Sequence, residues 1–286
     1  AALVAEYEEV KGKGLKLNMA RGKPGEDQLN LSRPLLDVIN SSTDCITAHG
    51  ADCRNYGELA GIDECKNFFA EIFDVDPSDV MVGGNSSLNM MFDTIAGFMT
   101  KPVVEGCKPW YEVKNRKFLC PAPGYDRHFA ITEYFDFDLI PVPMTENGPD
   151  MDVVEKLVEN DDSIKGIWCV PKYSNPLGIT FSDETVKRFA ALKPVAKDFG
   201  IMWDNAYCVH DVTDTPDELL SLMAECRKTG NVDLPIMFTS TSKITFPGSG
   251  VAAMAASDNN MKVIKNRYQY QVISCLLYTS PSPRDS

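Results

Sequence analysis

The order of apolar segments along the 286-residue chain restricts its fold more than any other feature. From about residue 56 onward, short apolar segments alternate with helical patterns. The expected strands cover residues 80–82, 117–120, 135–141, 164–170, 201–203, 236–238 and 251–255. Helices are expected over residues 86–99, 153–159, 183–192 and 216–229. This alternation predicts an α/β fold in which a doubly wound, mostly parallel sheet lies between two helical layers, giving a three-layer α/β/α domain.

Two of the expected helices are preceded by capping sequences. Ser182, followed by two acidic residues, is a typical N-cap. Thr215 and Glu218 have the spacing of a capping box, with Pro216 at the first helical position. We therefore expect the last helix to begin at residue 216.

Polar residues cluster where several of the expected strands end. Gly84 and Asn85 follow the first strand, and Lys243 follows the strand at residues 236–238. In an open parallel sheet, ligands bind beyond the carboxyl ends of the strands. The clusters therefore predict one shared site, to which these further residues belong: Ser86, Tyr125, Asn175, Asp204, Tyr207 and Ser240.

Lys243 lies in an unusual sequence context for a lysine. It stands between two expected buried strands and directly after the hydroxyl residues 239–242. Most lysines are exposed, but this position favours a desolvated amine able to form a Schiff base with a carbonyl compound.

These clusters, in this order, resemble those of the fold-type I pyridoxal-phosphate-dependent aminotransferases, the aspartate-aminotransferase-like superfamily, over about residues 18–257. The resemblance implies that pyridoxal 5'-phosphate (PLP) forms a Schiff base with Lys243, which also moves the proton of the substrate α-carbon. It implies that Asp204 pairs with the pyridine nitrogen and that Tyr207 donates to the phenolic oxygen. A carboxylate at the nitrogen keeps it protonated, so that the ring accepts electrons as the α-proton leaves. Lys243, Asp204 and Tyr207 are therefore the expected catalytic residues.

The resemblance also implies roles for the remaining residues. Tyr125 stacks on the cofactor ring, and Asn175 bonds its phenolic oxygen and helps to bind substrate. Gly22 lies in the N-terminal segment that covers the substrate. The implied phosphate ligands are Gly84, Asn85, Ser86 and Ser240. Tyr56 reaches the phosphate in the other subunit of a homodimer.

The implied activity is the transfer of an amino group between an amino acid and a 2-oxo acid. The same fold hosts PLP-dependent lyases and effector domains of transcriptional regulators, and these remain alternatives. The Ser-x-x-Lys, Ser-Asp-Asn and Lys-Thr-Gly motifs of serine β-lactamases also occur, but in the wrong order, so we attribute them to chance.

The sequence departs from the superfamily beyond Lys243. Many members carry a phosphate-binding arginine a short distance after the lysine, whereas residues 247–251 read PGSGV. Phosphate binding is then expected to depend on backbone amides, Ser240 and Ser249. This departure places the chain in a divergent branch of the superfamily.

The chain ends break the pattern of the middle. Residues 1–45, with a charged helix expected at residues 6–16, are interpreted as an N-terminal arm or part of a small domain, and residues 46–274 as an incomplete PLP-binding large domain. Residues 275–286, CLLYTSPSPRDS, resemble a translated sequencing adapter and are interpreted as a non-native tail. We therefore expect a fragment that lacks the C-terminal small domain.

Composition excludes other classes of protein. The net charge of −13 and the lack of a basic cluster argue against a nucleic-acid partner. The nine cysteines show no CxxC pairing, which favours reduced core thiols over a disulfide framework or a metal site. No signal peptide or long apolar span is visible, so we expect no membrane contact and a cytoplasmic location.

Overall fold

The computed structural model describes residues 2–16, 22–211 and 213–275, and the chain divides into two compact units, Ala1–Thr43 and Asp44–Ser286. The first unit contains α1 (Ala2–Gly12), α2 (Glu26–Leu31) and the 3-10 helix η1 (Arg33–Asp37), none of which has a buried residue. Helix α1 begins and ends earlier than the helix expected at residues 6–16, because Gly14 takes a φ of 60° that an α-helix cannot continue.

The second unit is built on an eight-stranded sheet with the order β1-β8-β7-β6-β5-β2-β3-β4. The strands are β1 (Val80–Val82), β2 (Lys117–Ala122), β3 (Asp138–Thr145), β4 (Gly148–Pro149), β5 (Ile164–Cys169), β6 (Gly200–Asp204), β7 (Pro235–Ser240) and β8 (Ala252–Ala256). The run from β7 through β6, β5 and β2 to β3 is parallel, whereas β8 is antiparallel to both of its neighbours and β4 to β3. The prediction of a mostly parallel sheet is therefore confirmed.

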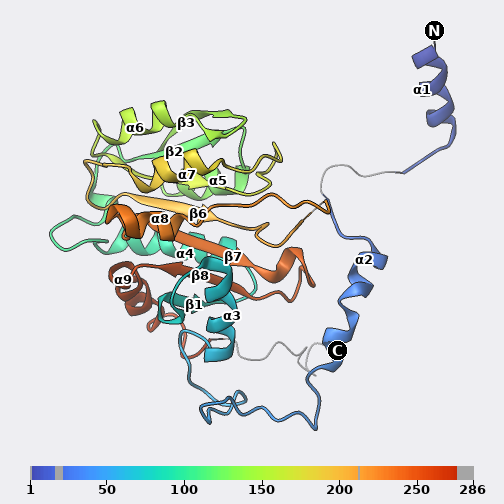
Figure 1. The fold of residues 1–286 in the computed structure, drawn as a ribbon, viewed down its shortest axis with the longest axis horizontal. Helices are drawn as coiled ribbons and strands as arrows, with labels where there is room; N and C mark the ends of the chain where they lie inside the picture. Colours follow the sequence, from blue (N-terminus) through green and yellow to red (C-terminus); the bar gives the residue numbers. More distant parts are fainter. Residues whose placement is uncertain (1, 17–21, 212, 276–286) are drawn as a thin grey trace. The chain divides into compact units, whose positions relative to one another are not determined.

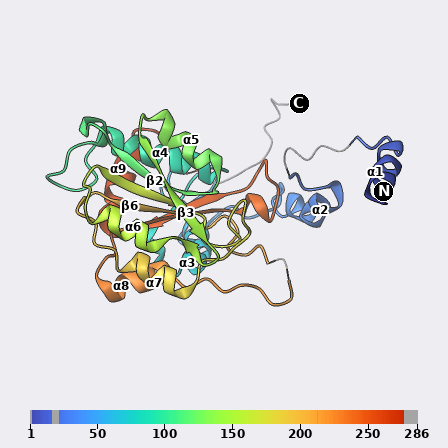
Figure 2. The same ribbon diagram turned by 90° about the horizontal axis from the view of Figure 1, so that it is seen from above.

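Helices cover both faces of the sheet (Figures 1 and 2). One layer contains α3 (Asp63–Phe73), α6 (Met151–Val158), α7 (Asp183–Ala190) and α8 (Leu222–Thr229), and the other contains α4 (Ser87–Thr100), α5 (Asp126–Tyr134) and α9 (Asp258–Tyr268). Side chains of β6 alternate between the two cores: Ile201 and Trp203 pack in one, and Met202 in the other. The three-layer α/β/α prediction is confirmed. Within the described parts of the chain, every helix is too short or too polar to cross a bilayer.

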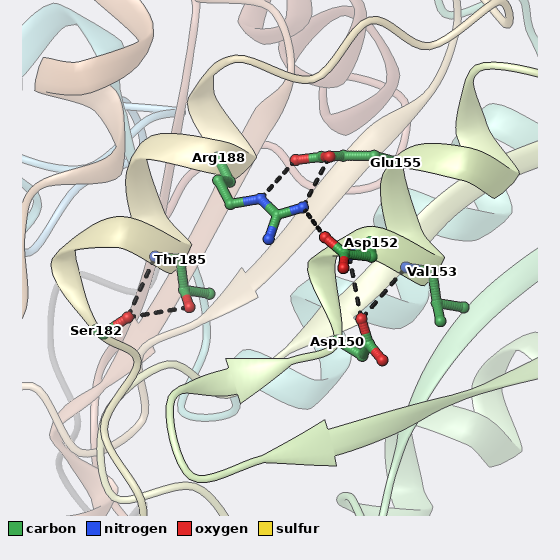
Figure 3. Close-up of polar contacts among 7 residues, drawn as sticks. All are labelled: Asp150, Asp152, Val153, Glu155, Ser182, Thr185 and Arg188. Carbon is green, nitrogen blue, oxygen red and sulfur yellow. Dashed lines mark hydrogen bonds and ion pairs between the residues drawn. The ribbon is translucent and has the colours of Figure 1, made fainter.

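Helices α6 and α7 are fixed to each other and to their caps by side-chain contacts (Figure 3). The Ser182 hydroxyl accepts from the Thr185 amide at 3.2 Å, which confirms the expected N-cap of α7. Arg188 of α7 donates to Glu155 of α6 from Nε and Nη2, each at 2.8 Å, and from Nη2 to Asp152 at 2.6 Å. This bidentate contact ties α7 to α6.

The expected helix at residues 216–229 is wrong in its first turn. Helix α8 begins only at Leu222, with Ser221 as the N-cap whose hydroxyl accepts from the Ala224 amide at 3.2 Å. The preceding segment is not helical because the Asp217 amide donates to the Tyr173 hydroxyl at 3.0 Å. A tertiary contact thus replaces the predicted capping box.

The strand expected at residues 135–141 begins later than predicted. Asp136 takes a left-handed conformation, with a φ of 55°, between α5 and β3. Phe137 is buried in the core beside this turn, and β3 starts at Asp138. The apolar side chains of Phe135 and Phe137 therefore pack the turn against the core and do not belong to a strand.

Candidate active site

A cavity of about 200 Å³ lies at the edge of the sheet where the parallel strands end. Strands β2, β5, β6 and β7 run in the same direction, so the segments that follow them meet at this edge. Strand β1 shares this direction, because β8 is antiparallel to both β1 and β7. The predicted site residues that line the cavity are Ser86, Tyr125, Asn175, Asp204, Tyr207, Ser240 and Lys243.

Asp204, the last residue of β6, provides a buried carboxylate in this cavity. The residue is 4% exposed, and its Oδ2 lies 2.9 Å from Nε2 of His128. Its Oδ1 is buried and has no hydrogen-bond partner among the described residues. Burying a polar atom without a partner is costly, so such an atom at a cavity marks a place where a ligand can donate a hydrogen bond.

His128, the partner of Asp204, is a residue to which sequence reasoning assigned no role. It lies in the first turn of α5 and is 1% exposed. Its ring stacks on Trp168, with 4.7 Å between centroids and 17° between planes, and meets the Tyr125 ring edge-on at 5.0 Å. The available signal was its position three residues after Tyr125, a spacing that brings side chains together at the start of a helix.

Lys243 ends the short 3-10 helix η4 (Thr241–Lys243) that follows β7. Its Nζ lies 5.3 Å from the centroid of the Tyr207 ring. The residue is exposed, so the expectation of a desolvated amine is wrong for this chain. The reason is the turn itself: it leaves the sheet after Ser240 and carries the lysine out of the buried layer.

Hydroxyl groups and a helix N-terminus form one end of the cavity. Ser86 is the N-cap residue of α4 and makes no side-chain capping bond, so the first amides of this 14-residue helix remain a favourable anion site. The hydroxyls of Ser240 and Ser242 each donate to the Asn85 carbonyl oxygen at 3.1 Å and lie 2.8 Å apart. Among the described lining residues, Lys243 carries the only cationic side chain.

Sequence reasoning did not assign Ser242 to the site, although it directly precedes the lysine and lines the cavity. Ser249, which was expected to help bind phosphate, is exposed and is not among the lining residues. Ser249 lies instead in a turn in which its amide donates to the Phe246 carbonyl oxygen at 3.0 Å.

Three other predicted residues of the second unit do not line the cavity. Gly84 is exposed, and Asn85 contributes its carbonyl oxygen to Ser240 and Ser242. Tyr56 is 80% exposed. Gly22 belongs to the first unit, where it is exposed.

The tail expected at residues 275–286 lies outside the described residues except for its first position. Cys275 is buried, and its thiol donates to the Val82 carbonyl oxygen at 3.2 Å. It therefore packs with the core beside the end of β1.

The family model described as aspartate amino-transferase matches residues 1–275. The chain belongs to the aspartate aminotransferase family. It is 46% identical over 256 residues to a putative aminotransferase of Mycolicibacterium smegmatis and 43% identical over 257 residues to the aspartate aminotransferase of Corynebacterium glutamicum. These matches cover 89% and 90% of the chain but only 60% and 59% of the relatives. The chain thus spans about three fifths of the length of these aspartate aminotransferase family members.

Solved structures of aminotransferases have the same fold. A putative aminotransferase from Corynebacterium diphtheriae is 41% identical, with a TM-score of 0.90 over 96% of this chain and 67% of its own. LysN, the α-aminoadipate aminotransferase of Thermus thermophilus, has a TM-score of 0.69 at 19% identity, which is a likeness of fold alone. LysN was solved with N-(5'-phosphopyridoxyl)-L-leucine.

The cofactor of the aspartate aminotransferase family is PLP, and the residues of this cavity fit it. The unpartnered Oδ1 of Asp204 suits the protonated ring nitrogen. The start of α4 with Ser240 and Ser242 suits the phosphate, and Lys243 supplies the amine. The cavity therefore offers a suitable group for the ring nitrogen, for the phosphate and for the aldehyde of PLP.

Proposed function

We propose that the chain forms the PLP-binding part of an aminotransferase that moves an amino group between an amino acid and a 2-oxo acid. The observation that carries this proposal is the buried, unpartnered Oδ1 of Asp204 in the same cavity as Lys243. One carboxylate oxygen is held by the protein, and the other is available to accept a hydrogen bond from the protonated ring nitrogen of PLP. The names of the relatives in Mycolicibacterium smegmatis and Corynebacterium glutamicum support amino transfer over the lyase and regulator alternatives.

When bound, PLP draws electrons away from the substrate α-carbon and so weakens its bond to hydrogen. Asp204 keeps a proton on the ring nitrogen, and His128 holds the Asp204 carboxylate in place from the other side. The stacking of His128 on Trp168 fixes the imidazole, so that the carboxylate is pre-organised before the ligand binds. The α4 N-terminus would hold the phosphate without an arginine, and the Ser240 and Ser242 hydroxyls would turn from the Asn85 carbonyl oxygen to donate to it.

Lys243 and Tyr207 act at the reacting end. The Lys243 Nζ would hold the cofactor until the substrate amine displaces it, and the freed amine would then take the α-proton of the substrate and return it to the product. The Lys243 Nζ lies over the face of the Tyr207 ring, 5.3 Å from its centroid, and this contact orients the lysine side chain. The Tyr207 hydroxyl and the Asn175 amide, which both line the cavity, would bind the phenolic oxygen of the cofactor.

The assembly that we propose is a cytoplasmic homodimer. The exposure of Tyr56, at 80%, leaves its hydroxyl accessible to the cavity of a second copy. Gly22 is assigned to the segment that covers the substrate. Residues 1–45 serve as the N-terminal arm, and residues 46–274 form the large domain.

Attachment of the cofactor tests this proposal. The unaltered chain, incubated with PLP and reduced with borohydride, should carry one cofactor on the peptide that contains Lys243, as read by mass spectrometry. Lys243→Ala should carry none, whereas Lys262→Ala, which removes an exposed lysine of α9, should behave as the unaltered chain. Cofactor retained by Lys243→Ala would refute the assignment.

The reaction class needs a second measurement. An aminotransferase consumes an amino acid only while a 2-oxo acid is supplied as acceptor, and the amino group appears on that acceptor. Release of free ammonia without an acceptor would instead indicate a lyase.

A further inference from the structure

Two consecutive side chains beyond β5, those of Lys172 and Tyr173, hold the segment that follows Tyr207. Lys172 Nζ donates to the Cys208 carbonyl oxygen at 3.2 Å and to Asp211 Oδ1 at 2.9 Å. The Tyr173 hydroxyl accepts from the Asp217 amide at 3.0 Å. We call these contacts the clasp. We propose that the clasp fixes Tyr207 relative to Asn175, so that Lys172 is a positioning residue for the bound cofactor.

The clasp joins the two segments that carry the proposed ligands of the phenolic oxygen. Asn175 follows Tyr173 closely in sequence, and Cys208 is the neighbour of Tyr207. Both Asn175 and Tyr207 line the cavity, whereas Lys172 and Cys208 line a different one. Lys172 therefore acts through the backbone of its partner segment and not on the ligand.

The segment after β5 is rigid enough to transmit this restraint. Ser174 and Ile179 are joined by a 2.8 Å backbone hydrogen bond, which closes the turn around Asn175. Tyr173 takes a φ of 46°, an unfavourable conformation for a residue with a side chain. Such a conformation persists only where surrounding contacts determine it, and the Tyr173 hydroxyl and the Lys172 ammonium, 5.2 Å from the Tyr173 ring, supply two of them.

Strand β7 holds the Tyr207 segment from the other side. The Thr239 hydroxyl donates to the Asn205 carbonyl oxygen at 3.0 Å and lies 3.3 Å from the Cys208 sulfur. Residues 205–208 have no helix or strand of their own. The Tyr207 segment is thus held by β7 on one side, through Phe238 and Thr239, and by Lys172 on the other, so loss of the Lys172 contacts should loosen it.

The chain offers a matched control at the opposite end of β5. Lys165 Nζ donates to Asp198 Oδ1 at 2.8 Å, and Lys165 and Lys172 are almost equally buried, at 6% and 7% exposure. Lys165→Met removes the cationic partner of the buried Asp198 carboxylate. Lys172→Met removes the partner of Asp211, but the Asp211 side chain is 42% exposed and water can hydrate it. The control therefore costs more stability, but it does not touch the Tyr207 segment.

The inference rests on the proposed function, and cofactor titration tests it. Lys172→Met should weaken PLP binding by about tenfold, because an ordering contact next to a ligand is lost. The same change made in a Tyr207→Phe chain should have a much smaller effect, because Lys172 acts through Tyr207. Asp211→Asn keeps an acceptor for Lys172 and should retain most of the affinity. Lys165→Met should lower the unfolding midpoint more but leave the affinity unchanged.

Hydrogen exchange of the cofactor-free chain provides a readout that does not depend on cofactor. Amides of residues 205–211 should exchange faster in Lys172→Met than in the unaltered chain and in Lys165→Met. Unchanged exchange in this segment, or equal weakening of PLP binding by the two lysine variants, would overturn the inference. Failure of the unaltered chain to bind PLP would instead overturn the proposed function, while the exchange measurement would still decide whether the clasp orders the Tyr207 segment.

Discussion

Asp204 and His128 share a buried hydrogen bond in which Asp204 Oδ2 lies 2.9 Å from His128 Nε2. The other oxygen of the same carboxylate, Oδ1, is buried without a partner among the described residues. The protein thus orients the carboxylate with one oxygen and leaves the second for a ligand. This division predicts that the electronic role proposed for Asp204 can be separated from retention of the cofactor.

Asp204→Asn should lower the rate of amino transfer by about 10²- to 10³-fold, because an amide cannot stabilise positive charge on the ring nitrogen. Attachment of the cofactor through Lys243 should persist, since the amide has nearly the same shape. Single-turnover kinetics and borohydride trapping of the same sample measure the two quantities. Equal losses of rate and attachment would mean that the carboxylate is only structural.

A second buried carboxylate, that of Asp198, stabilises the fold at the opposite end of the sheet. It accepts from Lys165 Nζ at 2.8 Å and from Trp110 Nε1 at 2.9 Å. Lys165→Met should destabilise the chain by about 3 kcal/mol, because removing one partner of a buried pair leaves an uncompensated charge. Lys117→Met is the comparison: Lys117 and Asp161 are each 31% exposed, and their loss should cost less than about 1 kcal/mol. Urea unfolding measures both, and equal costs would contradict the burial argument.

Much of the fold could be predicted because buried parallel strands leave a direct record in the sequence. Strands β1 and β8 and residues 235–238 of β7 are continuous apolar segments, and each is followed by glycine or hydroxyl residues. Neighbouring strands of one direction bring those residues to one edge, so Asp204 and Lys243 could be expected at the same cavity. Whether they bind PLP as assigned stays a prediction.

The remaining features depend on contacts between residues far apart in sequence. Helix α8 does not begin at residue 216 because the Asp217 amide donates to the Tyr173 hydroxyl, a contact that local capping rules do not consider. The partner of Asp204 is His128, on a helix that precedes β6 by a long interval. The exposure of Lys243 follows from the turn after β7, and the apolar flanks that suggested burial belong to the strands and not to the turn.

Burial of thiols should make the fold less stable at high pH. Burial raises the pKa of the Cys120 and Cys226 thiols from 9.0 to about 12. As pH rises above 9.0, these thiols ionise in the unfolded chain but keep their protons in the folded chain until about pH 12, so the free energy of unfolding should fall across this range. Unfolding titrations at a series of pH values measure the slope.

The control for this pH dependence is the variant Cys120→Ala/Cys226→Ala. Its free energy of unfolding should fall less steeply with pH because the two buried thiols are gone, and some slope should remain because other groups, such as lysines and tyrosines, still titrate. The two slopes would coincide if the buried thiols ionised as freely in the folded chain as in the unfolded chain.

The loop after Lys243 contains two glycines with opposite surroundings. A Cβ added to Gly250 would lie 2.5 Å from Ser242 Oγ and 2.8 Å from the Ser242 backbone nitrogen, whereas a Cβ added to Gly248 would meet nothing within 4 Å. Gly250→Ala should therefore displace Ser242 and with it the adjacent Lys243, weakening PLP binding by about tenfold or more, because backbone atoms cannot move aside as a flexible side chain can. Gly248→Ala should bind PLP as the unaltered chain does, which controls for the effect of a methyl group in this loop. Titration of each variant with PLP measures the difference, and normal binding by Gly250→Ala would show that the position of Ser242 is not needed for the site.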